Sequence, residues 1–250
     1  AVWASEDFAE ELAADFDVQG AAPGGRVVAG SREGVRRKVA GRKEPFGLLA
    51  EQLSMVATQG ARLVTVRGDE GIGKTRFLAE VDYRLRRMHH PVLWFGVSCT
   101  PATRGTPLGG LQLLLRTLLS IEEGDAESVV RAKARRVREL GLTPDEMLAL
   151  GAVLGVVSAA VDIGDAARRT LRASLEKIVG RLVGDKVAVL ALDRGEHLDD
   201  ASEALFDDLA QSSDTARLLL VVAAETGRRF AWEERARHLE IVLDPLVPEE

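Results

Sequence analysis

The sequence predicts an α/β fold of three layers, in which a parallel β-sheet is covered by helices on both faces. Short apolar runs rich in β-branched residues alternate with segments of helical periodicity along most of the 250 residues. This alternation is typical of strands joined by crossover helices. Residues 187–193 and 217–224 are apolar except at one end, which indicates strands buried on both faces. A glycine-rich turn that joins the first apolar run to a helix is the third observation.

This turn, residues 68–75, reads G-D-E-G-I-G-K-T and fits the pattern G-x-x-x-x-G-K-[S/T] of a phosphate-binding loop, the P-loop. The apolar run at 63–66 predicts a strand before it, and apolar residues at helical spacing over 77–85 predict a helix after it. Glycine permits positive φ angles and a close approach of the backbone to a ligand, and the helix N-terminus favours phosphate. The alternative is a glycine turn before an ordinary amphipathic helix.

In a P-loop, Lys74 places its charge on the β- and γ-phosphates, and the hydroxyl of Thr75 is placed to ligate Mg²⁺. We therefore expect a nucleotide site with Mg²⁺ as its metal. The residues expected to contact the nucleotide are Gly68, Asp69, Glu70, Gly71, Ile72, Gly73, Lys74, Thr75 and Arg76.

Composition excludes several other classes of protein. The net charge of −6 argues against a broad nucleic-acid surface, which is usually basic, so direct binding of nucleic acid is not expected. A single cysteine, Cys99, excludes an internal disulfide and a cysteine-based zinc site. The longest uncharged run, residues 147–161, is too short to span a membrane. We expect a cytoplasmic protein, and because the chain begins at Ala1 we expect a fragment of a longer one.

The chain is predicted to hold two parts. Residues 1–38 are expected to form an acidic helix within 1–20, a glycine-rich linker at 20–25 and most of a solvated basic segment that runs from Arg26 to Lys43. Residues 39–250 are expected to form the nucleotide-binding domain. Its predicted helices cover 45–58, 77–85, 108–119, 122–140, 143–161, 165–183 and 199–209, and its predicted strands cover 63–66, 91–98, 187–193, 217–224 and 239–243.

Two of these elements carry more specific expectations. Thr143 and Glu146, three residues apart with Pro144 between them, predict a capping box at the start of an apolar, interior helix. Asp193, at the end of the third strand, stands at the Walker B position, where an aspartate holds Mg²⁺. The alternative is that Asp193 only caps the following turn. In parallel sheets ligands bind beyond the carboxyl ends of the strands, so the P-loop and Asp193 are expected to converge.

These motifs together resemble the STAND class of AAA-related signalling ATPases, as found in large LuxR-type regulators and behind some adenylyl cyclase domains. The segment A-G-R-K-E at 40–44 is similar to the family's VGR-E motif, which implies that Arg42 lies near the adenine and ribose. Segments 106–108, 193–202 and 243–250 resemble the family's later motifs, the last being the entry to a helical lid before which the chain stops. The resemblance implies a P-loop NTPase sandwich that binds ATP and Mg²⁺.

The sequence departs from this family at two places. Arg194 stands where the family usually has a second acidic residue that polarises the attacking water, and Glu196 or Asp199 is the possible substitute. The fourth strand ends in A-A-E-T instead of the family's polar or arginine sensor. Arg228 and Arg229 follow shortly after it, as displaced sensors or as surface charges.

Two hypotheses on function follow. In the first, the chain is a nucleotide-dependent regulatory switch that hydrolyses ATP slowly or with a partner's help, with Lys74, Asp193 and Glu196 as catalytic residues and Thr75 and Asp193 as metal ligands. Its partners are ATP and ADP, other domains of a longer chain or another protein, and a second copy in nucleotide-dependent self-association. In the alternative, the ATPase has degenerated into a nucleotide-binding or protein-interaction scaffold without turnover. A DNA-loading ATPase fits less well, because the chain is acidic.

Overall fold

The computed structural model describes residues 2–4, 16–22, 25–31, 42–87, 92–122, 124–157, 163–212 and 216–245. The chain separates into two compact units, Ala1–Ala40 and Gly41–Glu250. None of the described helices combines the length and the apolar composition that crossing a bilayer requires.

The first unit contains a three-stranded antiparallel sheet in the order β1-β3-β2. Its strands are β1 (Val2–Ala4), β2 (Phe16–Ala22) and β3 (Gly25–Ser31). The helix predicted within 1–20 is therefore wrong at both ends, and its middle, residues 5–15, lies outside the described residues. The predicted linker also belongs in part to β2 and β3. Strand formation fits the valine and aromatic content of these segments, since β-branched and aromatic side chains favour extended backbone.

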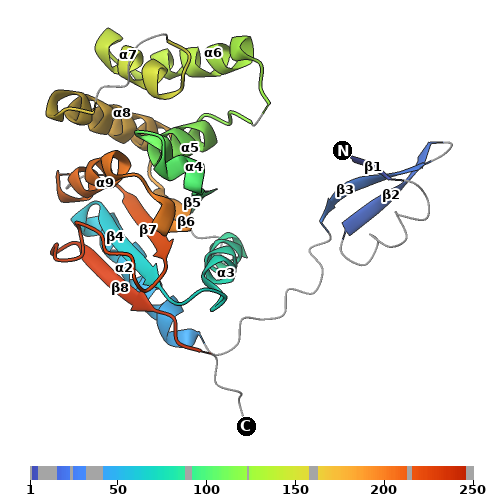
Figure 1. Cartoon of the computed structure of the whole chain (residues 1–250), viewed down its shortest axis with the longest axis horizontal. Coiled ribbons are helices and arrows are strands. Elements are labelled where there is room, and N and C mark those ends of the chain that lie inside the picture. The colour runs from blue at the N-terminus through green and yellow to red at the C-terminus, as the bar shows by residue number, and fades with distance from the viewer. Residues whose placement is uncertain are drawn as a thin grey trace. The chain divides into compact units, whose positions relative to one another are not determined.

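The second unit is built on a five-stranded parallel sheet in the order β5-β6-β7-β4-β8 (Figure 1). All five strands predicted for this part of the chain are confirmed, each to within a residue or two of its predicted bounds. The strands are β4 (Arg62–Arg67), β5 (Val92–Ser98), β6 (Val187–Asp193), β7 (Leu218–Ala224) and β8 (His238–Val242).

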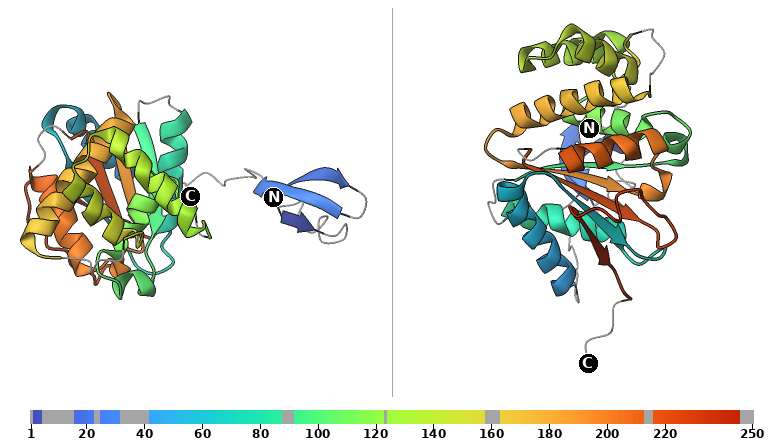
Figure 2. Two further views of the ribbon diagram at one scale, coloured as in Figure 1. Left: turned by 90° about the horizontal axis from the view of Figure 1, so that it is seen from above. Right: turned by 90° about the vertical axis from the view of Figure 1, so that its left-hand side faces the viewer.

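Helices cover both faces of this sheet, as predicted (Figure 2). Along β7, alternate side chains enter two separate apolar cores: Leu218, Leu220 and Val222 enter one, and Leu219 and Val221 enter the other. This two-sided burial explains why β7 is apolar throughout and β6 is apolar up to Asp193. The first core is closed by α5 (Gly109–Leu118), α8 (Asp165–Val183) and α9 (Asp200–Ser212), and the second by α2 (Lys43–Gln59) and α3 (Lys74–Arg87).

A further helical layer lies beyond α5 and α8, on the side away from the sheet (Figures 1 and 2). It is part of the long connection between β5 and β6. Besides α5 and α8, this connection contains α4 (Pro101–Arg104), α6 (Glu127–Arg135), the 3₁₀ segment η1 (Arg136–Leu140) and α7 (Pro144–Val153). The predicted capping box of α7 is confirmed, because Glu146 N donates to Thr143 Oγ1 and Thr143 N to Glu146 Oε2.

Two helix bounds in this layer were predicted wrongly. The helix expected from Glu122 begins only at Glu127, because Asp125 accepts a hydrogen bond from Glu122 N and Gly124 has a φ of +92°, which together make a turn. The helix expected to reach Val161 ends at Val153, and Gly155 follows with a φ of +72° typical of a helix C-terminus. The last part of that prediction, residues 158–161, lies outside the described residues. This helix is also not fully interior, since Leu148 is 54% exposed.

The strand order determines what meets at the carboxyl edge of the sheet. β7 lies between β4 and β6, so the loop after β4 is one strand away from the end of β6. Helix α3 leaves that loop and packs across β7, β6 and β5. Its first turn is thereby directed toward the end of β6.

Candidate functional site

The loop between β4 and α3 is held in a fixed conformation by three of its glycines. Gly71 and Gly73 have φ angles of +77° and +100°, which side-chain-bearing residues rarely adopt. Gly68 is packed closely, because a Cβ there would lie 2.6 Å from Ile72 Cγ2 and 3.2 Å from the carbonyl oxygen of Leu243. The helix that follows is regular from its first turn, with Phe77 N donating to Gly73 O at 2.8 Å.

The ammonium group of Lys74 closes this loop. Its Nζ donates to the carbonyl oxygens of Gly68 at 2.8 Å and of Asp69 at 3.0 Å. The side chain is half-buried. A cation therefore lies at the centre of the loop, bonded to neutral carbonyls that an anionic oxygen can replace, since hydrogen bonds between charged groups are roughly twice as strong as neutral ones.

Thr75 and Asp193 meet, as the sequence predicts. Thr75 Oγ1 donates to Asp193 Oδ2 at 2.7 Å. The other carboxylate oxygen, Asp193 Oδ1, is buried and has no hydrogen-bond partner among the described residues. A buried carboxylate oxygen without a partner is costly. A hydroxyl and a carboxylate with one free oxygen are oxygen donors of the kind that a hard cation such as Mg²⁺ takes, so the residues present fit the metal.

The chain turns sharply after Asp193. Arg194 has φ 54° and ψ 48°, a left-handed conformation uncommon for residues other than glycine, asparagine and aspartate, and its side chain is exposed. It leads into the 3₁₀ segment η2 (Gly195–His197). Glu196 lies there with Oε2 buried and without a hydrogen-bond partner in the described part of the chain. Arg104 Nη1, from α4, donates to the backbone carbonyl of Glu196 at 3.3 Å.

Three carboxylates lie near Cys99 at the end of β6. The backbone N–H of Cys99 donates to the carbonyl oxygen of Asp193 at 2.9 Å. Burial and then the nearby carboxylates of Asp199, Glu196 and Asp193 raise the pKa of the Cys99 thiol to about 12. Such a concentration of negative charge at the edge of a sheet favours a bound cation.

Asp199 has a structural role, although the sequence left it as a possible catalytic carboxylate. Its Oδ1 accepts from the backbone N–H groups of Leu108 and Ser202, and its Oδ2 from that of Gly110, all at 2.9 Å. The side chain is 4% exposed. Asp199 thus joins the N-termini of α5 and α9, and both of its oxygens already accept hydrogen bonds from backbone N–H groups.

The remaining predicted site residues surround the loop. Arg42 is 5% exposed, and its Nη2 donates to the carbonyl oxygen of Ile72 at 3.1 Å, so it supports the loop backbone from the start of α2. Asp69 and Glu70 are exposed at the tip of the loop, and Arg76 is exposed on the first turn of α3.

The sequence did not reveal two contacts that join the loop to the segment after β7. Thr226 Oγ1 donates to Asp69 Oδ1 at 2.9 Å. Arg67, 3% exposed at the end of β4, donates to the carbonyl oxygens of Glu225 and Arg228 and pairs with Glu233. Only the strand order places β7 beside β4, and no sequence motif states that order.

Arg228 and Arg229 are both engaged by glutamates. Arg228 Nη2 pairs with Glu203 on α9, and Arg229 Nη1 pairs with Glu233 at 2.9 Å. Arg229 is 79% exposed. In this structure neither guanidinium contacts the P-loop, which favours the interpretation of both as structural or surface charges.

Comparison with known families agrees with this geometry. The model of the AAA ATPase domain matches residues 38–222, which include Arg42, the P-loop, α3 and the strand that ends at Asp193. A comparison with curated proteins found no match. The match covers most of the chain and includes both the P-loop and Asp193. The chain therefore belongs to the AAA ATPase domain family of P-loop NTPases.

Proposed function

We propose that the chain binds Mg-ATP and acts as a nucleotide-dependent regulatory switch with slow or partner-dependent hydrolysis. Membership of the AAA ATPase domain family supports nucleotide binding. The proposed Mg²⁺ site rests on one observation. Thr75 donates a 2.7 Å hydrogen bond to one carboxylate oxygen of Asp193, and the other oxygen of Asp193 is buried without a partner among the described residues.

Each loop residue has a role in this proposal. The N-terminus of α3 and the loop backbone would face the phosphates, apart from the Ile72 N–H, which donates to the carbonyl oxygen of Asp69 at 3.2 Å. Lys74 exchanges its bonds to the Gly68 and Asp69 carbonyls for phosphate oxygens. Arg42 keeps the loop backbone in place through Ile72 O. Thr75 and Asp193 hold Mg²⁺, which when bound supplies positive charge against the phosphate oxygens.

Slow hydrolysis follows from the residues around Asp193. Glu196 is the carboxylate proposed to orient the attacking water, because its Oε2 is buried without a described partner, whereas both oxygens of Asp199 already accept backbone hydrogen bonds. Arg194 occupies the adjacent position with a positive charge, which does not polarise water as a base. Loss of one positioning group costs orders of magnitude in the rate of phosphoryl transfer.

The switch is proposed to act through the segment after β7. Thr226 contacts Asp69 in the loop, and Arg67 connects the same segment to the end of β4. Contacts of the loop with a γ-phosphate would change these bonds, and hydrolysis would restore them. By resemblance to the STAND class, we propose that residues 39–250 form the nucleotide-binding domain. Its partners are other domains of a longer chain, another protein or a second copy.

The experiment for the switch is hydrogen exchange of the 250-residue chain in Mg-ATP, in Mg-ADP and without nucleotide. We expect residues 225–233 and 194–199 to exchange more slowly with Mg-ATP than with Mg-ADP. Lys74→Ala, which removes the cation at the centre of the loop, is the control and should show no nucleotide effect. Equal protection by both nucleotides in the parent chain would contradict a switch while leaving nucleotide binding intact.

The second candidate function is a scaffold that binds nucleotide without turnover. Arg194 favours it, because it stands beside Asp193 in the position at which the resemblance implies an acid. Single-turnover phosphate release from a saturated Mg-ATP complex separates the two. No release over hours would favour the scaffold, and release within minutes that Lys74→Ala abolishes would exclude it.

A further inference from the structure

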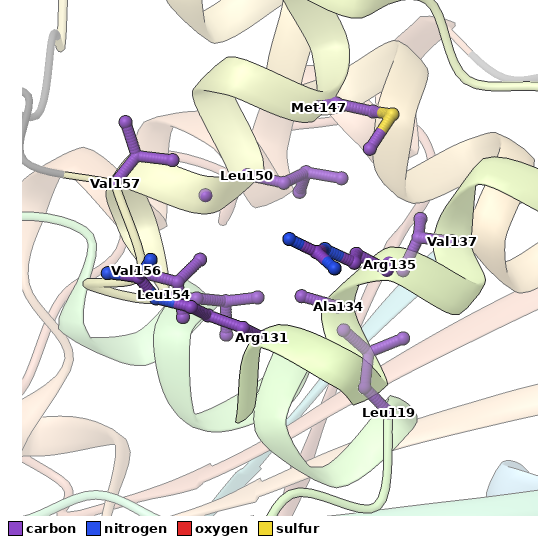
Figure 3. A pocket seen from close by; sticks show the side chains of 11 residues that line it. Leu119, Arg131, Ala134, Arg135, Val137, Met147, Leu150, Leu154, Val156 and Val157 are labelled. Carbon is purple, nitrogen blue, oxygen red and sulfur yellow. The ribbon is translucent and has the colours of Figure 1, made fainter. Parts of the chain in front are cut away.

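The outer helical layer contains a cavity that the nucleotide site does not use. It has a volume of about 250 Å³ and lies between the end of α5, α6, η1 and α7 (Figure 3). Its lining consists of Leu119, Arg131, Ala134, Arg135, Val137, Met147, Leu150, Gly151, Leu154, Val156 and Val157. None of these residues belongs to the P-loop or to the end of β6.

The walls of this cavity are apolar and fixed in place. Val137, Leu150 and Leu154 are 3%, 4% and 6% exposed, because they also belong to the larger apolar core. Met147 adds a flexible thioether at one side (Figure 3). Methionine adapts to ligands of different shape, and an apolar cavity of this kind accepts aliphatic groups more readily than water.

The polar part of the cavity is cationic. Arg135 points into its middle, and Arg131 lies along the wall near Leu154 and Val156 (Figure 3). Arg131 is paired with Glu127 one helical turn earlier. The side chain of Arg135, which is exposed on α6, forms no hydrogen bond or ion pair with any described residue. The cavity therefore combines an apolar interior with one guanidinium that is free to bind an anion.

We propose that this cavity binds a small amphipathic carboxylate, with its aliphatic chain between α6 and α7 and its carboxylate paired with Arg135. Guanidinium and carboxylate match in a planar, two-bond geometry, which favours a carboxylate over a cation or a neutral head group. The volume is below that of sites for drug-sized ligands, so the ligand is short, with an aliphatic chain of about eight carbon atoms. The proposal is independent of nucleotide binding.

The test uses octanoate as the probe and Met147 as the reporter. The chain has three methionines, so ¹³C-methyl labelling gives a simple spectrum. We expect octanoate, below its micellar concentration, to shift the Met147 methyl signal in a saturable way and to leave Met55 of α2 unchanged. Acetate, which lacks the chain, and octylamine, which carries the opposite charge, should cause no saturable shift.

Three variants make the test specific. Arg135→Gln should weaken octanoate binding by about tenfold, the effect of one charged hydrogen-bonded pair. Arg181→Gln, an exposed arginine on α8 outside the cavity, is the matched control and should bind as the parent does. Ala134→Leu fills the cavity and should abolish binding while the Met55 signal remains that of the folded chain. Equal binding by Arg135→Gln, equal binding of octylamine, or no saturable shift of Met147 would each overturn the proposal.

Discussion

Thr75, on the first turn of α3, donates a 2.7 Å hydrogen bond to Asp193, at the end of β6 and 118 residues later in the chain. β4, the strand before the P-loop and α3, is not a neighbour of β6, the strand that ends at Asp193, because β7 lies between them. Thr75 and Asp193 meet because α3 crosses the sheet from the P-loop toward β6 and β5. This pair therefore links the loop that would hold the phosphates to the carboxylate that would hold the metal.

The first prediction concerns the metal. Asp193→Asn removes the charge that fits Mg²⁺ but keeps the size of the side chain and an acceptor for the Thr75 hydroxyl. We expect the affinity for ATP in Mg²⁺ to fall by tenfold or more, to the level that the parent shows in EDTA. Calorimetric titration of both proteins, with and without Mg²⁺, measures this. An Asn variant that keeps the parent's full Mg²⁺ dependence would exclude Asp193 as the metal ligand.

Asp193→Asn is expected to weaken ATP binding without lowering the stability of the free protein. Without nucleotide, the Asp193 carboxylate is 9% exposed and one of its oxygens has no partner among the described residues, which costs free energy. The neutral amide should therefore leave the melting temperature of the free protein equal or higher. Differential scanning calorimetry of parent and variant measures it, and a lower melting temperature would mean that Asp193 serves the fold instead.

A second prediction concerns Arg194. Arg194→Asp places an acid beside Asp193, and aspartate tolerates the left-handed backbone at this position. If the chain is a slow ATPase, phosphate release from saturating Mg-ATP should rise by about tenfold or more. Arg194→Asn is the control, since it removes the positive charge without adding an acid. A rise of equal size in both variants would mean that the charge of Arg194 inhibits, and no rise would favour a scaffold.

A third prediction is that Asp199 stabilises the fold and does not take part in ATP hydrolysis. Asp199→Ala removes the acceptor of three buried backbone N–H groups and should lower the free energy of unfolding by about 2–4 kcal/mol. Asp200→Ala, at a side chain that is 98% exposed, should cost less than about 1 kcal/mol. Urea unfolding measures both. An Asp199→Ala protein of unchanged stability with lost turnover would assign the residue to catalysis.

A fourth prediction concerns pH. Burial lowers the pKa of His238 below its ordinary value of 6.5, and the neutral ring fits its partners, Thr65 Oγ1 at 2.9 Å and Glu233 O at 3.2 Å. Because the unfolded chain then binds the proton more readily, stability is lost as pH falls through the unfolded pKa. Stability should therefore fall from roughly pH 7.5 to 5.5, and His238→Gln should make this fall smaller.

Urea unfolding at several pH values checks this. Above roughly pH 7.5, where the ring is neutral in both states, parent and variant should change in parallel. Equal acid sensitivity of the two proteins would mean that His238 is not responsible for the loss.

The sheet and the centre of the site could be predicted because their signals are local. A strand buried on both faces must be apolar, and a loop with positive φ angles needs glycine at positions such as 71 and 73. The capping box of Thr143 and Glu146 also lies within one turn. Each of these features is decided by residues that are close in sequence.

The parts that could not be predicted depend on long-range arrangement. The contact of Thr226 with Asp69 spans 157 residues and exists because β7 lies beside β4. Asp199 accepts a hydrogen bond from the backbone N–H of Leu108 at the start of α5, and the position of α5 follows from packing in the first apolar core. In the first unit, the helical spacing of Phe8, Leu12 and Phe16 among acidic residues predicted a helix, whereas strand pairing determined the structure at 2–4 and 16–22.

The most direct test of the central claim is a calorimetric titration of Mg-ATP into the 250-residue chain and into Lys74→Ala. Among the described residues, Lys74 Nζ bonds only to loop carbonyls, so its removal should leave the fold intact, as circular dichroism would show. We expect micromolar binding with one site per chain in the parent and none in the variant. Unchanged affinity in Lys74→Ala, or no binding by a folded parent chain, would contradict the assignment of this loop as the nucleotide site.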